Sequence, residues 1–342
     1  MARRTAEARG VALATPLLML LLALLVALAV SAGSTAIPLV AVWKIAGNQV
    51  FPGLFEADWS TAGERIVWEL RFPRSLLAIL VGAGLAMSGA ALQATTRNVL
   101  ADPFLLGVSS GAALGAVAVI SHLGDFAGLY SLPLMAFLGG LLSLGLLLGA
   151  LGRNDGAADR VILAGAAVSF LLMAGTNLLI FLGDQRAAHS VVFWMLGGLG
   201  RARWTQLWIP AGAVVLGGLW LTWKARELNA MMMGEEAAYA LGVDATRLRL
   251  SVLAVTALMT SVLVSITGAI GFVGLVVPHV LRAWVGGNNR LLLPLCALCG
   301  GIFMVAVDIF ARTALAPQEL PIGVVTGGLG GAYFTWLMAR RR

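Results

Sequence analysis

Long apolar runs, separated by short polar segments, make up the chain from one end to the other. A helix needs about 20 apolar residues to cross the hydrocarbon core of a bilayer, and these runs have roughly that length. The pattern predicts an all-α, polytopic membrane protein with one transmembrane domain over residues 1–342. The predicted spans cover residues 11–32, 66–94, 104–121, 131–151, 161–182, 204–223, 250–268, 271–285, 291–311 and 321–338. A short apolar stretch after His189 predicts a further helix that does not cross.

Composition supports this prediction, and the distribution of positive charge indicates how the chain is oriented in the membrane. Hydrophobic residues make up 60% of the chain and charged residues only 11%, against about 25% charged in a soluble domain. If the N-terminus lies inside, most of the 23 Lys and Arg residues fall in cytoplasmic segments, as the positive-inside rule requires. Both termini are therefore expected in the cytoplasm. The net charge of +7 is then explained by the excess of Lys and Arg in the cytoplasmic loops, and no nucleic-acid partner is expected.

Motifs that supply chemistry or energy are missing from the sequence. It contains no G-x-x-x-x-G-K-[ST] phosphate loop, and its three histidines form no catalytic or metal-binding pattern. Cys296 and Cys299 lie within an apolar run, where packing explains them. Asp308 is the main carboxylate within a span. We therefore expect no catalytic residue, no metal site and no cofactor bound by this chain; any energy for transport would come from another polypeptide.

The longest polar interruption, residues 224–250, falls in a predicted cytoplasmic segment. Glu235 and Glu236 precede a short helical pattern, where acids favour the helix dipole, and Gly242 follows as a stop signal. Two interpretations remain open from these residues alone. The segment could dock onto a soluble partner, or it could be an amphipathic helix lying on the bilayer.

Five stretches resemble the FecCD-type permeases of ABC importers for haem, ferric siderophores and cobalamin. They are RFPRSLLAILVGAGLAMSGAALQ (71–93), RNVLADPFLLGVSSGA (97–112), GEEAAYALGV (234–243), GFVGLVVPHVLR (271–282) and ARTALAPQELPIGVVTGGLG (311–330). The resemblance extends from about Arg71 to the C-terminus. It departs from the family's Asn-Pro-Leu-Ala at residues 98–101, where this chain has Val99 instead of proline.

The resemblance implies a homodimer of ten-span subunits in the bacterial inner membrane, with the transport path on the two-fold axis. Two ABC ATPase subunits, which hold ATP and Mg, would bind on the cytoplasmic side, and a periplasmic substrate-binding protein would deliver cargo outside. A coupling segment at about residues 227–247 would contact the ATPase. The residues that the resemblance assigns to this contact are Glu235, Glu236, Ala237, Tyr239, Leu241 and Gly242.

Three further groups of residues receive roles. Arg71, Arg74 and Arg312 fall at the outer boundary, and the resemblance implies docking to the binding protein; snorkelling to lipid headgroups is the alternative. Asn98 and Leu100 are the cytoplasmic gate candidates, against an alternative in which Asn98 merely caps the next helix. Glycines at four-residue spacing predict close helix packing. These glycines are Gly107, Gly111, Gly115, Gly323, Gly327 and Gly331.

The cargo is the least determined feature. Overall similarity favours haem, followed by a ferric siderophore and then cobalamin. Two other classes of function remain as alternatives. An ion-coupled secondary transporter would need a carboxylate relay in the membrane, for which Asp308 is the candidate. A membrane-embedded enzyme would need a catalytic cluster at one depth, and the sequence shows none.

Overall fold

The computed structural model describes residues 2–33, 37–152 and 158–340, and these form helices joined by short loops. Within these ranges, eight helical segments are long and apolar enough to cross a membrane. Their helices are α1 (Ala2–Ser31), α4 (Phe72–Thr96), α6 (Ser131–Leu151), α7 (Ala158–Leu182), α9 (Trp204–Trp223), α12 (Ala245–Thr267), α14 (Asn289–Thr313) and α15 (Ile322–Arg340). Two shorter apolar segments, α5 (Val108–Ala118) with its extension η3 (Val119–Leu123), and α13 (Val273–Val285), occupy the other two predicted spans.

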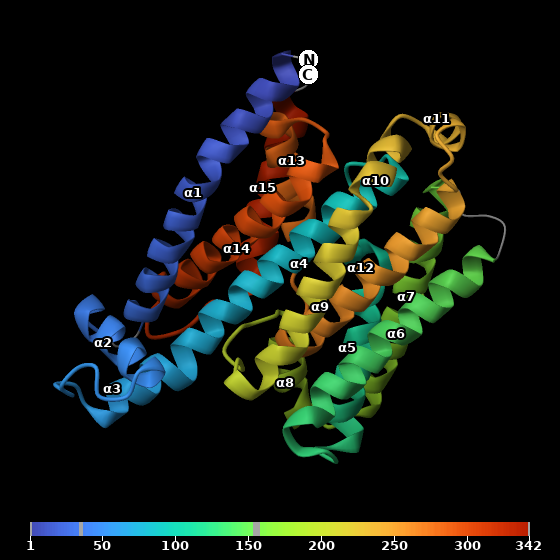
Figure 1. Cartoon of the computed structure of the whole chain (residues 1–342). Helices are drawn as coiled ribbons and strands as arrows, with labels where there is room; N and C mark the ends of the chain where they lie inside the picture. Colours follow the sequence, from blue (N-terminus) through green and yellow to red (C-terminus); the bar gives the residue numbers. More distant parts are fainter. Residues whose placement is uncertain (1, 34–36, 153–157, 341–342) are drawn as a thin grey trace.

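The remaining elements are short and lie between these helices. They are α2 (Leu39–Val50), α3 (Thr61–Arg65), η1 (Ile66–Arg71), η2 (Pro103–Leu106), η4 (Gly128–Tyr130), α8 (Gln185–Met195), α10 (Ala225–Met232) and α11 (Glu235–Ala240). The predicted non-crossing helix after His189 corresponds to α8. The two ends of the chain and α11 lie at one end of the molecule, while α2, α3 and α8 lie towards the other (Figure 1). This arrangement matches the predicted orientation, with α11 on the cytoplasmic side.

The third predicted span, residues 104–121, is not one continuous helix. Asp102 caps the 3₁₀ turn η2, and Gly107, with a φ of 87°, breaks the chain direction before α5 starts at Val108. A left-handed φ favours glycine because a Cβ atom would clash there. The spacing of apolar residues alone did not reveal this break, since both parts are apolar.

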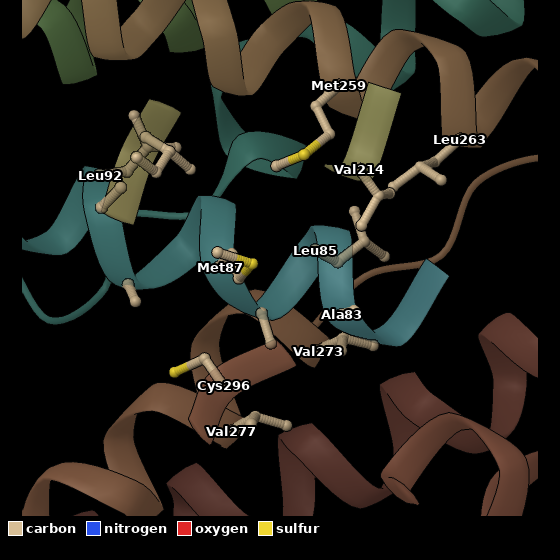
Figure 2. Close-up of a cluster of buried hydrophobic side chains, with 14 of the residues drawn as sticks. Ala83, Leu85, Met87, Leu92, Val214, Met259, Leu263, Val273, Val277 and Cys296 are labelled. Atoms are coloured by element: carbon tan, nitrogen blue, oxygen red, sulfur yellow. The ribbon is translucent and has the colours of Figure 1, made fainter. Parts of the chain in front are cut away.

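Helix α4 is the centre of the fold. It packs against α9 and α12 on one side and against α13 and α14 on the other. Figure 2 shows Ala83, Leu85 and Met87 between side chains of these neighbours, including Val214 and Cys296. Every residue from Val81 to Thr96 is buried. A helix that is buried on all faces needs small residues, because its neighbours must approach from every direction.

Glycine pairs make the closest of these approaches. A Cβ atom built on Gly89 would lie 1.9 Å from the carbonyl oxygen of Gly274 in α13. One built on Gly82 would lie 2.0 Å from the carbonyl oxygen of Gly300 in α14. Backbone atoms cannot move aside as a flexible side chain can, so glycine is required at both crossings.

The glycines predicted from four-residue spacing divide into two groups. Gly111 and Gly115 lie against the backbone of α6, and Gly323 lies against the Leu196 carbonyl, whereas Gly107 serves the turn described above. Gly327 and Gly331 have no atom within 4 Å of a built Cβ. At these two positions no described atom of another element lies that close, so their role in helix packing stays a prediction.

We expect Gly89→Ala to destabilise the chain by about 1–3 kcal/mol, the usual cost of overpacking a core. The added methyl group would collide with the Gly274 carbonyl. The measurement is the free energy of unfolding in detergent micelles during titration with a denaturing surfactant. The matched control is Gly145→Ala in α6, where a Cβ meets no atom within 4 Å. It should leave stability unchanged or raise it by up to about 1 kcal/mol; equal losses for both variants would contradict the packing argument.

Candidate functional site

The predicted coupling segment is a pair of short helices between α9 and α12. Helix α10 ends at Met232, and the chain turns at Gly234, whose φ is 115°, before α11 begins at Glu235. Gly242, with a φ of 78°, provides a second turn. Asp244 then caps α12 by accepting a hydrogen bond from the Arg247 amide at 2.9 Å. The predicted helix start at Glu235 and the predicted stop at Gly242 are thus both present, and α11 projects from the cytoplasmic end of the molecule (Figure 1).

A buried arginine fastens α11 to the transmembrane helices. The side chain of Arg249 in α12 is only 2% exposed, and its guanidinium pairs with the carboxylate of Glu235 at 2.5 Å. Its Nε donates to the carbonyl oxygen of Thr95, in the last turn of α4, at 3.3 Å. A cation at a helix C-terminus also interacts favourably with the helix dipole. Glu235 is therefore a link within the chain, with only part of its surface free for a partner.

Helix α10 is fastened in a second way. The Asn229 side-chain oxygen accepts hydrogen bonds from both the backbone and the side-chain amide of Asn289, at 2.8 and 2.9 Å. These bonds join α10 to the first residue of α14. The segment is thus held at two points, and a force applied to it would reach α4, α12 and α14.

The outward side of the coupling segment carries uncovered apolar groups. Met233, Tyr239 and Leu241 are 73%, 82% and 65% exposed, and Glu236 is also exposed, whereas Ala238 is fully buried beneath them. Ala237 is half-buried, and Gly242 lies beside Tyr239 along an open groove. Large apolar side chains at an aqueous tip are typical of a contact surface for another protein. Helix α11, with six residues, is also shorter than a typical interfacial helix.

The three outer arginines form a network inside the chain. Arg71 donates to the carbonyl oxygens of Val30 and Ser31, both at 2.8 Å. Arg312 donates to the carbonyl oxygens of Ala29 and Ala32 at 2.7 and 3.0 Å. These carbonyls end α1 or follow it, and helix C-termini leave such carbonyls without partners of their own. The two arginines therefore cap the first span.

Asp308 lies at the centre of this network. One of its oxygens is 2.8 Å from Nε of Arg74, and the other is 3.0 Å from Nε of Arg312. Arg74 also reaches the carboxylate of Glu319, in the loop before α15, at 2.8 Å. The side chain of Asp308 is 1% exposed and that of Arg74 is 12% exposed. Asp308 is thus the counter-charge of two buried arginines, which is a different role from an unpaired proton relay.

The structure therefore brings Arg71, Arg74 and Arg312 together but leaves little of them exposed. The snorkelling interpretation is wrong, since their guanidinium groups bind partners in the protein. Docking to a binding protein stays a prediction.

Sequence reasoning missed Arg201 and Arg203, which are exposed beside an outer cavity of about 720 Å³ that is also lined by Gln206. Their place in the polar turn before Trp204, on the predicted outer side, was the available signal.

The gate candidates lie in the turn that follows α4. Arg97 ends the helix with a φ of 51°, and the side-chain oxygen of Asn98 accepts a hydrogen bond from the Leu100 amide at 2.9 Å. Asn98 thus shapes the turn, and Leu100 is 43% exposed. The alternative in which Asn98 caps the next helix is wrong, because Asp102 does so by accepting from the Phe104 amide at 2.7 Å. The gate role itself stays a prediction.

Asp102 is the titratable group of this turn, outside the spanning helices. Burial raises the pKa of its carboxyl to about 6, although the Phe104 amide stabilises the charged form. An Asp carboxyl in an unfolded chain has a pKa of about 3.9. The folded chain therefore binds this proton more tightly than the unfolded chain does. The contribution of Asp102 to stability is greatest below about pH 4 and is lost as the pH rises through about 6.

We expect Asp102→Asn to flatten the dependence of unfolding free energy on pH between about 4 and 6. The amide retains an oxygen acceptor for the Phe104 amide but carries no titrating proton. The measurement is surfactant-induced unfolding at several pH values. The control is Asp58→Asn, in an exposed outer loop. It should not flatten the dependence of unfolding free energy on pH between about 4 and 6. An unchanged slope for Asp102→Asn would show that this carboxyl titrates normally.

Asp308→Asn should destabilise the chain by about 3–5 kcal/mol, because it leaves two buried arginines without their shared counter-charge. Asp58→Asn, which removes the exposed Lys44–Asp58 pair, should cost much less, because solvent screens an exposed ion pair. Unfolding free energies of both variants in the same detergent provide the comparison. Equal stability of Asp308→Asn and the unmodified chain would disprove the counter-charge role.

Known proteins similar to this chain agree with the arrangement described above. The FecCD transport family matches residues 20–340. The hemin transport permease HmuU of Yersinia pestis is 38% identical over 84% of this chain and 88% of its own length. The vitamin B12 import permease BtuC of Salmonella paratyphi A is 41% identical over 86% of this chain and 89% of its own length.

A solved metal-chelate type ABC transporter in an inward-facing conformation has the same fold. The two superpose with a TM-score of 0.81 and 31% sequence identity, over 94% of this chain and 97% of the other. The prediction of an all-helical, multi-pass transport subunit that is not itself an enzyme is thereby confirmed. The chain belongs to the FecCD transport family and is a permease of an ABC importer in the bacterial inner membrane.

Proposed function

We propose that this permease imports haem, driven by two ABC ATPase subunits and supplied by a periplasmic binding protein. The observation that carries the cargo assignment is an apolar concavity of about 390 Å³ between η2, α8, the loop before α13, and α15. Phe104, Met195 and Phe272 line it together with glycines and aliphatic residues, and none of its lining side chains is polar.

The lining favours haem over the two other cargoes by its chemistry. A porphyrin is a broad apolar plane, and its carboxylates lie at one edge. Cobalamin carries amide groups around its ring, and many siderophores carry hydroxyl and amide groups. Such groups lose hydrogen bonds to water on entering an apolar site, at a cost of roughly 1–3 kcal/mol each. A passage lined in this way admits haem with the smallest loss.

Aromatic groups continue along the same helices towards the cytoplasm. The ring of His279 in α13 lies 5.9 Å from that of Tyr333 and 5.8 Å from that of Phe334, both in α15. Aromatic rings provide favourable contacts for another planar π system. This cluster would offer a macrocycle a second aromatic surface, between α13 and α15.

The homodimer is the second part of the proposal. Gly327 and Gly331 present an open face of α15, next to the apolar concavity. Small residues at four-residue spacing allow two membrane helices to approach closely. A second copy of the chain against this side of the molecule would enclose the concavity between the two subunits. It would remove an apolar surface that one chain leaves open.

The ATPase contact is assigned to the exposed side of the coupling segment. Tyrosine is frequent among the residues that contribute most to protein interfaces. We therefore expect Tyr239→Ala to weaken ATPase binding at least tenfold. Tyr130→Ala, on an exposed tyrosine at the outer end, is the matched control and should bind normally. Binding can be measured by calorimetry with the purified ATPase in detergent, and an unchanged affinity for Tyr239→Ala would contradict the assignment.

Transport itself is tested with the permease, its ATPase and its binding protein in lipid vesicles. The binding protein is loaded separately with haem, a ferric siderophore and cobalamin, and ATP-dependent accumulation is followed. We expect haem alone to accumulate. Uptake of a siderophore or cobalamin instead would reject the cargo assignment while retaining the importer. Ion-driven uptake without the ATPase would favour the secondary transporter.

A further inference from the structure

A second apolar groove lies on the membrane-facing side of the molecule, away from the proposed path. It has a volume of about 390 Å³ and lies between α1, α4 and α14. Apart from Thr15 and Arg290, its lining side chains are apolar. The Thr15 hydroxyl is satisfied by the Val11 carbonyl at 2.8 Å, so it adds no free polar group. The representative lining residues are Met19, Leu22, Ile79, Ala83, Pro294 and Leu298.

The groove occupies the cytoplasmic half of the membrane. It follows α14 from Arg290, next to the cytoplasmic start of that helix, to Leu298. Eight residues of helix extend about 12 Å. Half of the hydrocarbon core is about 15 Å thick. The groove therefore has the length of one leaflet, with its charged end at the cytoplasmic surface and its apolar end near the bilayer centre.

Arg290 provides a cation at the cytoplasmic end of the groove. Its side chain is exposed, and it makes no ion pair or side-chain hydrogen bond with any residue that the structure describes. This distinguishes it from Arg282, which donates to the Ala90 carbonyl, and from Arg249, which binds Glu235. A cation at the membrane surface, directly above an apolar groove, matches an amphiphile with an anionic head.

We propose that this groove binds an anionic phospholipid of the cytoplasmic leaflet, with its phosphate at Arg290 and an acyl chain along α14. The groove does not join the apolar concavity of the proposed path, since the two have no lining residue in common. The lipid would join α1 to α4 and α14. The proposal is independent of the cargo.

Charge favours the lipid over a second copy of the chain as the occupant. The cytoplasmic segments of this protein are mostly basic, so a second copy would bring further positive charge to this level of the membrane. The segment before the groove, residues 3–9, contains three arginines and one glutamate. Anionic headgroups supply the opposite charge at the same level.

The test uses the full-length permease, stripped of lipid in detergent, and native mass spectrometry with two lipids of identical acyl chains. We expect phosphatidylglycerol to bind at least tenfold more tightly than phosphatidylcholine. Arg290→Leu should abolish this preference, and Ala297→Phe, which fills the groove, should weaken the binding of both lipids. Arg226→Leu removes another exposed cytoplasmic arginine and should leave the preference intact. Unfolding curves establish that each variant is folded.

Three outcomes would overturn the proposal. The first is equal binding of the two lipids by the unmodified chain, and the second is a preference that persists in Arg290→Leu. The third is cross-linking of two permeases through Met19→Cys, in a Cys296→Ala/Cys299→Ala background, with the same yield with and without phosphatidylglycerol. That result would assign the groove to a second copy. Because no ATPase, binding protein or cargo is present, failure here leaves the transport proposal unaffected.

Discussion

The close backbone crossings of α4 with α13 and α14 are the constraint on which the rest of the structure depends. At Gly89 and Gly82, carbonyl oxygens of the neighbouring helices occupy the positions that side chains would need. In a membrane, lipid tails are as apolar as the helix surfaces, so close packing replaces the hydrophobic effect as the source of association. These two crossings fix the distance of α13 and α14 from the central helix, and the positions of the other groups follow from it.

Helix α4 also connects the two ends of the molecule that are proposed to meet partners. At its outer end, Arg74 pairs with Asp308 of α14 and Glu319 of the following loop. At its inner end, the Thr95 carbonyl accepts from Arg249, which in turn binds Glu235 of the coupling segment. The predicted gate turn begins directly after the same helix. A displacement of α4 would therefore act on all three places, without requiring a chain of small side-chain movements between them.

The sequence was informative where a property is local. Apolar runs predicted the spanning helices, and the glycine and acid positions predicted the turns around α11, because each depends on a few neighbouring residues. It was uninformative where distant residues meet. Arg74 and Asp308 are 234 positions apart, and nothing near either residue indicates the other. Helix α2 was missed because its apolar run is short and ends in Gly47, Asn48 and Gln49. Four-residue spacing predicted packing at Gly327 but does not show what lies opposite, and a Cβ built there meets no described atom within 4 Å.

Burial of the outer arginines changes how a binding protein would be recognised. Arg71, Arg74 and Arg312 contribute three positive charges, whereas Asp308 and Glu319 contribute two negative ones, so the network keeps one net positive charge. Asp308 is enclosed, but the side chain of Glu319 is 51% exposed and is held only at the edge of the network. A carboxylate of a partner could therefore replace Glu319 on Arg74 without disturbing the pairs at Asp308. Recognition would then exchange one counter-charge of Arg74 for another. The partner's carboxylate would form an ion pair with Arg74, and Glu319 would be released together with the loop before α15. Since that loop leads directly into the helix beside the apolar concavity, docking outside would change the helix that lines the proposed path.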